Sequence, residues 1–130
     1  MNQTFLEHIE KIVMADQRYA ADAYAFVMEA LAYTQKRFGS ERHVTGEELL
    51  EGIRELVVKE YGFLAVEVLH NWGVRTTEDL GHIVFNLVDH GILGKQEDDS
   101  FDSFRNGFDF TSTLGKDYRR QLTAVARRMR

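Results

Sequence analysis

Five histidines are the residues of this chain best suited to metal binding or proton transfer: His8, His43, His70, His82 and His90. His82 and His90 are eight positions apart in a segment with helical periodicity, so about 12 Å would separate them along one helix face. One zinc ion cannot bridge that distance, because imidazole nitrogens bind it at about 2.0–2.1 Å. His70 could meet His43 only through tertiary packing. We therefore predict no metal site.

The sequence also lacks the signatures of common catalytic and cofactor sites. Because it contains no cysteine, it has no thiol nucleophile, thiolate ligand or disulfide. It contains no glycine-rich phosphate-binding loop and no Gly-x-Ser-x-Gly turn. Its carboxylates suit solvated helix faces, and four of them occupy the first turns of one predicted helix: Glu47, Glu48, Glu51 and Glu55. We predict no catalytic residue and no cofactor, and an enzyme of unknown class is an alternative.

Basic residues in the loops between helices are better candidates for a functional surface, since such loops commonly carry binding residues. Arg42 and His43 lie in one predicted loop, and His70 and Arg75 lie around another. We predict that these four residues contact a partner. The alternative is that they form surface ion pairs with nearby glutamates, which stabilise a protein little.

The elements that position these residues are predicted from apolar spacing to be helices. Their expected ranges are 4–15, 19–38, 45–61, 63–71, 77–90 and 113–129. The third helix has the clearest start, because Thr45 and Glu48 form a capping-box pattern. Val44 and Leu49 form the matching hydrophobic staple around that cap.

The second helix carries apolar residues on two sides. Tyr19, Phe26 and Tyr33 are seven positions apart and form a second stripe beside the core stripe. A helix of this kind is either central or at an interface. Self-association through it is therefore one expectation. The only tryptophan, Trp72, is expected to be buried at the turn before the fifth helix.

The order of elements in the second half of the chain suits a winged helix-turn-helix. Gly91 is placed to end the fifth helix in the left-handed conformation. Ile92–Leu93 then predicts a short strand, and Phe108 and Phe110, after the turn at Asn106–Gly107, predict another. These strands would form the wing.

We therefore predict a mainly α protein of one domain. Residues 1–40 form two N-terminal helices, residues 41–111 form a winged-helix-like core with a short β wing, and residues 112–130 form a basic C-terminal helix.

Two stretches of the chain resemble a family of small bacterial proteins with no assigned activity. They are HVTGEELLEGIRE at 43–55 and LHNWGVRTTEDLGHIVFNLV at 69–88. Examples of the family come from planctomycetes, verrucomicrobia and their relatives, and the likeness runs from about Tyr24 to Phe110. The resemblance implies a bacterial, cytoplasmic protein but no particular activity. The basic C-terminal helix is not part of the family pattern.

Charge is distributed unevenly along the chain. Residues 116–130 hold six basic residues against Asp117, a net +5, so the other 115 residues must carry −10 to give the chain's −5. We expect the basic end to complement a helix dipole and to pack on the acidic body. Contact with an anionic partner is the alternative.

The charges also disfavour nucleic acid, although a winged-helix DNA-binding regulator remains an alternative. A recognition helix reads bases with its first residues, and that position holds Thr76–Asp79 with only Arg75 basic nearby. The predicted wing carries Asp98 and Asp99, where phosphate contacts need cations.

No apolar run is long enough to span a membrane, and the first residues show no secretory signal. With no cysteine, these features favour the cytoplasm. We predict a non-enzymatic protein-interaction or regulatory module. Its partner is an unknown protein or a second copy bound through the Tyr-rich second helix.

Overall fold

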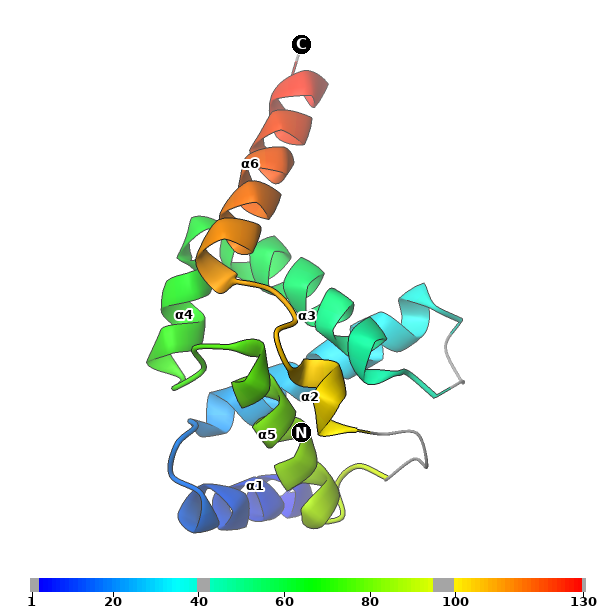
Figure 1. The fold of residues 1–130 in the computed structure, drawn as a ribbon, viewed down its shortest axis with the longest axis vertical. Helices are drawn as coiled ribbons and strands as arrows, with labels where there is room; N and C mark the ends of the chain where they lie inside the picture. The colour runs from blue at the N-terminus through cyan, green and yellow to red at the C-terminus, as the bar shows by residue number, and fades with distance from the viewer. Residues whose placement is uncertain (1–2, 40–42, 95–99, 130) are drawn as a thin grey trace.

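The structure, a computed structural model, describes residues 3–39, 43–94 and 100–129. The described chain is mainly helical and contains no strand (Figure 1). Its elements are α1 (Gln3–Ala15), α2 (Ala21–Arg37), α3 (Gly46–Tyr61), the 3-10 turn η1 (Gly62–Leu64), α4 (Ala65–Asn71), α5 (Thr77–Asp89), the 3-10 turn η2 (Phe101–Phe104) and α6 (Phe110–Arg128). None of these helices combines the length and apolar character that a membrane span requires.

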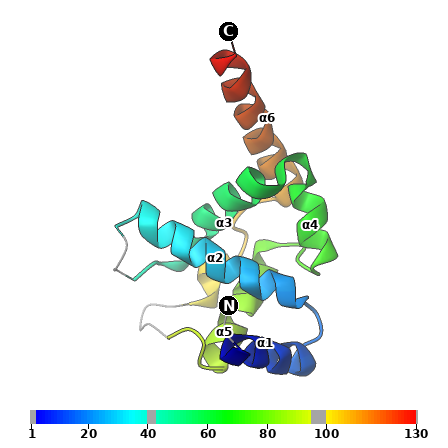
Figure 2. The same ribbon diagram turned by 180° about the vertical axis from the view of Figure 1, so that it is seen from behind.

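Helix α2 lies at the centre of the fold and packs against α1, α3 and α5 (Figures 1 and 2). It approaches α3 closely where Gly52 faces the Thr34 side chain. Tyr19 and Phe26, from the second apolar stripe, are buried within the chain. The two-sided pattern therefore belongs to a central helix, and self-association through α2 would have to use other residues.

The predicted start of α3 is confirmed. The Glu48 backbone N–H donates to Thr45 Oγ1 at 3.1 Å, and the Thr45 N–H donates to Glu48 Oε1 at 3.0 Å. Val44 and Leu49, which flank this cap, are both buried. The capping box and the staple thus set the direction in which the chain enters α3.

Helices α4 and α5 both end in a glycine-based Schellman motif. At the end of α4, Gly73 has φ +89°, and the Val74 N–H donates to Leu69 O at 2.8 Å. At the end of α5, Gly91 has φ +74°, and the Ile92 N–H donates to Leu87 O at 2.9 Å. Both glycines therefore end helices, as their places in the sequence predict.

The predicted β wing is wrong for the residues that the structure describes. Ile92 and Leu93 are half-buried beside the core and both donate backbone hydrogen bonds to Leu87 O. Their apolar side chains therefore close the end of α5 and do not pair in a sheet. Asp98 and Asp99, expected in the wing, lie outside the described residues.

The second expected strand is also absent, because Phe110 begins α6. The Asp109 side chain caps this helix by accepting from the Ser112 N–H at 2.9 Å, so α6 starts three residues earlier than its apolar spacing indicates. The rings of Phe108 and Phe110 still contact each other, with centroids 5.6 Å apart.

A polar cluster ties the α1–α2 loop to α5. The Arg18 guanidinium donates to both oxygens of Asp16, and Asn86 Nδ2 donates to Asp16 at 2.9 Å and to the Tyr24 hydroxyl at 3.0 Å. The Arg18 hydrogen bonds are the main cause that holds the pKa of Asp16 well below its usual range.

This cluster predicts a loss of stability in acid. Since the pKa of Asp16 is lower in the folded state, its contribution is complete above the unfolded value of about 3.9 and fades as the pH falls further. Asp16→Asn should therefore lower the free energy of unfolding near neutral pH, and the difference from the parent should shrink below about pH 4. Urea unfolding at a series of pH values measures this. Asp89→Asn, at the exposed end of α5, controls for the lost charge, and a difference independent of pH would contradict the prediction.

Candidate functional site

Of the four predicted partner-contact residues, the three that the structure describes are not all brought together. Arg42 lies outside the described residues, and His43 is exposed just before α3. His70 and Arg75 are exposed near the turn after α4, which is fixed to the start of α2 because the Ala20 N–H donates to Trp72 O at 3.0 Å. The start of α3 and the turn after α4 lie near opposite ends of α2 (Figure 2), and a partner role for each of these residues remains a prediction.

The other histidines pack separately from one another. The rings of His82 and Phe101 contact each other with centroids 4.8 Å apart and planes tilted by 37°, and His90 Nδ1 lies 3.0 Å from Asn86 O. His8 Nδ1 lies 2.8 Å from Thr4 O. Over the described ranges, no three His, Asp or Glu side chains are grouped to hold a metal ion.

The feature that stands out is α6, whose outer half projects from the body (Figure 1). Every residue from Arg119 to Met129 is exposed. Arg127 and Arg128 lie in its last turn, where cations complement the helix dipole. The expectation that the basic end packs on the acidic body is wrong for residues 119–129, because the helix leaves the body after two turns.

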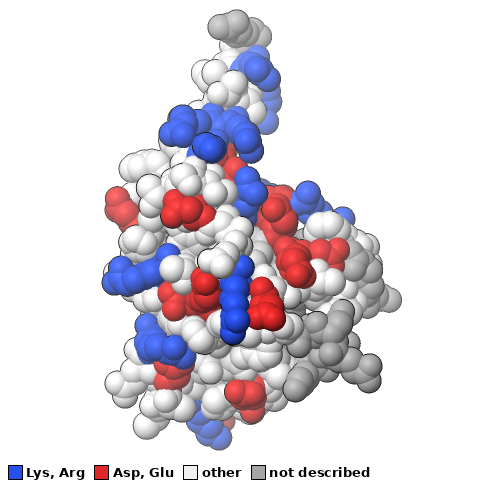
Figure 3. Space-filling view, in the orientation of Figure 1, with Lys and Arg blue, Asp and Glu red and all other residues white. Residues whose placement is uncertain are grey.

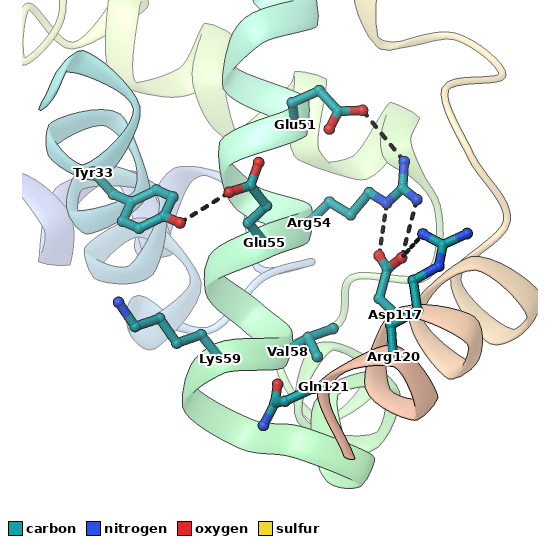
Figure 4. Close-up of a pocket in the computed structure, with 9 residues that line it drawn as sticks. All are labelled: Tyr33, Glu51, Arg54, Glu55, Val58, Lys59, Asp117, Arg120 and Gln121. Atoms are coloured by element: carbon teal, nitrogen blue, oxygen red, sulfur yellow. Dashed lines mark hydrogen bonds and ion pairs between the residues drawn. The ribbon is translucent and has the colours of Figure 1, made fainter. Parts of the chain in front are cut away.

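A bidentate ion pair holds the base of α6 to α3 (Figure 4). Arg54 Nε and Nη2 donate to the two oxygens of Asp117 at 2.7 and 3.0 Å. These hydrogen bonds are the main cause that raises the pKa of Arg54 above its ordinary value. Such planar pairing fixes geometry as well as distance, and together with the buried Phe110 and Leu114 it holds the base of α6 on the body.

An open pocket of about 510 Å³ lies in the angle between α2, α3 and α6 (Figure 4). Its lining residues are Tyr33, Glu51, Arg54, Glu55, Val58, Lys59, Asp117, Arg120 and Gln121. Many of their charged groups pair with each other or with neighbours: Glu55, for example, accepts from the Tyr33 hydroxyl at 3.0 Å and pairs with Arg37. We therefore interpret this pocket as part of the polar interface between α2, α3 and α6.

The apolar face of α6 continues beyond the body without a cover. Leu114 is buried against the core and Tyr118 is half-buried. One turn beyond Tyr118, Leu122 is 48% exposed, and three turns beyond it Met129 is 81% exposed. Val125, between them, is also exposed. The apolar face by which α6 packs on the body thus continues beyond the body, where no part of the described chain covers it.

This apolar face is continued at its base by η1. Phe63 is 70% exposed, and its ring centroid lies 6.0 Å from that of Tyr118. Leu64 beside it is exposed too. We call the set Phe63, Leu64, Tyr118, Leu122, Val125 and Met129 the arm surface.

The arm and the body differ in charge on the face shown in Figure 3. Lys and Arg side chains gather on the projecting helix, whereas the body below it carries Asp and Glu mixed with further Lys and Arg. Arg120 reaches Asp117 at 3.4 Å, within its own helix. The apolar spacing of α6 is visible in the sequence, but the sequence does not reveal that its outer half is uncovered.

No protein-family model, curated protein or solved structure matches this chain.

Proposed function

We propose that this chain is a non-enzymatic interaction module of the bacterial cytoplasm, and that the arm surface is its contact site. The partner that fits this surface is a protein with an apolar helix face and with acidic groups within reach of the arginines of α6. His43, His70 and Arg75, which were proposed as contact residues from the sequence, lie outside the arm surface, and the proposal does not depend on them.

The uncovered apolar face of α6 carries this proposal. A lone helix is marginal in water and takes most of its stability from tertiary packing of its apolar face. Exposed apolar surface that continues a buried stripe is characteristic of a protein-binding site. The surrounding arginines keep the uncovered helix soluble and favour an acidic partner by electrostatic complementarity.

Site-specific photo-crosslinking tests this proposal. A benzophenone amino acid replaces Val125 on the arm surface, and in a matched variant it replaces Thr123 on the opposite face of the same exposed segment. Irradiation of bacterial cells that express each variant should give protein adducts several times more abundant at position 125. Adducts with a second copy or with another protein both support an interaction module, whereas equal or absent labelling at 125 contradicts it.

Nucleic-acid binding is a second candidate, and the four exposed arginines of α6 are the observation that favours it: Arg119, Arg120, Arg127 and Arg128. Without a wing in the described residues, the groove-reading arrangement loses a part of its support. The acidic body also opposes phosphate, which supplies most of the affinity in such complexes.

Any nucleic-acid affinity is expected to reside in the basic end. Deletion of residues 116–130, or replacement of the four exposed arginines by glutamine, should abolish it, while Arg75→Ala should change it little. Fluorescence polarisation with labelled duplex DNA and RNA at several salt concentrations measures both effects, because each lost phosphate contact lowers the salt dependence. Specific duplex binding that is lost in Arg75→Ala and kept without the basic end would instead restore the groove-reading regulator.

A further inference from the structure

We infer that the arm surface binds a second copy of this chain, with two α6 helices paired antiparallel about a two-fold axis. The inference rests on the proposed function and names its partner. It is carried by the spacing of the arm residues and by the charges beside them.

The spacing on the exposed half of α6 is that of a helix–helix seam. Tyr118, Leu122, Val125 and Met129 follow one another at intervals of four, three and four residues. This is the alternation of a and d positions in a heptad, the narrow stripe by which one helix packs against another. The seam extends about 16 Å along the helix.

The same spacing is self-complementary in the antiparallel direction. Intervals of four, three and four read the same from either end, so a two-fold axis near Thr123 and Ala124 places Leu122 opposite Val125 of the second copy. In the same register Tyr118 meets Met129 of the second copy. A two-fold dimer requires such a surface, because each patch must match itself.

The charges beside the seam also permit this direction. In an antiparallel pair, each e position faces an e position of the other helix, and each g position faces a g position. Arg119 then faces Ala126 of the second copy, and Gln121 faces Arg128. No two arginines of these flanks stand directly opposite, so pairing avoids the repulsion that like charges at such flanks would cause.

The body of the second copy complements the tip of the arm. An antiparallel pair brings Met129 of one copy toward Phe63 at the base of the other arm, where a thioether and an exposed ring make a favourable contact. It also brings Arg127 and Arg128 beside a body whose residues outside 116–130 carry a net charge of −10. A parallel pair would instead place two acidic bodies side by side.

Sedimentation velocity tests the dimer with the full chain. Between about 5 and 500 µM, the range suited to a small interface, the mass should rise from 15.0 kDa toward twice that value. Leu122→Glu should raise the dissociation constant at least about tenfold, because it places an unpaired charge in the seam. Thr123→Glu, which makes the same charge change on the outer face of α6, should leave it within about threefold.

Disulfide trapping tests the register of the two helices. Because the chain contains no cysteine, only the introduced cysteines can form disulfides. Gln121→Cys mixed with Arg128→Cys should form a mixed disulfide quickly under mild oxidation. Each variant alone should form its own disulfide slowly, because equivalent positions lie about 10 Å apart along an antiparallel pair. Faster pairing of each variant with itself would indicate parallel helices and overturn the inference.

The outcomes separate this inference from the proposed function. A dimer weakened by Leu122→Glu and not by Thr123→Glu, with the mixed disulfide, supports both. A chain that remains monomeric at all concentrations, while position 125 crosslinks another protein, overturns the self-pairing and leaves the interaction module standing. A monomer without crosslinks overturns both, and a dimer unaffected by Leu122→Glu overturns the assignment to the arm.

Discussion

Trp72→Ala is expected to lower the free energy of unfolding by about 3–5 kcal/mol, as for other large truncations in a core. Trp72 is 8% exposed, and its ring packs against Phe26 and Tyr61 with centroids 5.5 and 5.8 Å away. Its backbone carbonyl also accepts from the Ala20 N–H. The ring therefore joins the first half of α2 to the ends of α3 and α4, and alanine would leave a cavity at that junction.

Urea unfolding followed by circular dichroism measures this loss. Phe63→Ala is the matched control, because that ring is mostly exposed and its removal should cost less than about 1 kcal/mol. If Trp72→Ala unfolded at the same urea concentration as the parent, the ring would not be a core element. A role in contacting a ligand would then be the better explanation.

Gly73→Ala is expected to be the second most damaging of these changes. Its φ of +89° is unfavourable for any residue with a Cβ, at about 1–2 kcal/mol. An added Cβ would also collide with the carbonyl oxygen of Arg18, which is backbone and cannot rotate away. The turn would have to move off the start of α2, and overpacking of this kind costs about 1–3 kcal/mol more.

Gly91→Ala separates the two contributions. Gly91 has φ +74°, but an added Cβ would meet no atom of the described chain within 4 Å. It should therefore show the conformational cost alone. Thermal or urea unfolding of both variants measures the difference, and equal destabilisation by the two changes would show that the contact with Arg18 does not constrain the turn.

Local signals in the sequence determined where many helices of this protein begin and end. Thr45 with Glu48 identifies the start of α3 because the cap is formed by residues three positions apart. Gly73 and Gly91 identify the ends of α4 and α5 because the left-handed conformation is a property of one residue. The burial of Trp72 also followed, since a large ring between two amphipathic helices has apolar surface on both sides.

The wing could not be predicted correctly, because strand formation depends on a partner strand that is distant in sequence. Ile92 and Leu93 are equally suited to a strand or to a helix cap. They form the cap because their backbone N–H groups donate to the carbonyl of Leu87 at the end of α5. Phe110 was likewise compatible with a strand until Asp109 capped the helix that it begins.

The candidate site also depends partly on local sequence and partly on tertiary structure. The apolar spacing from Leu114 to Met129 and the basic character of that segment can both be read from the sequence. Only the tertiary structure decided that Leu114 is covered and Leu122 is not, because the body that packs on the base of α6 does not extend as far along the helix as Leu122. Burial is a relation between distant parts of the chain, so residues of the same type on the same helix face can serve the core or be left for a partner.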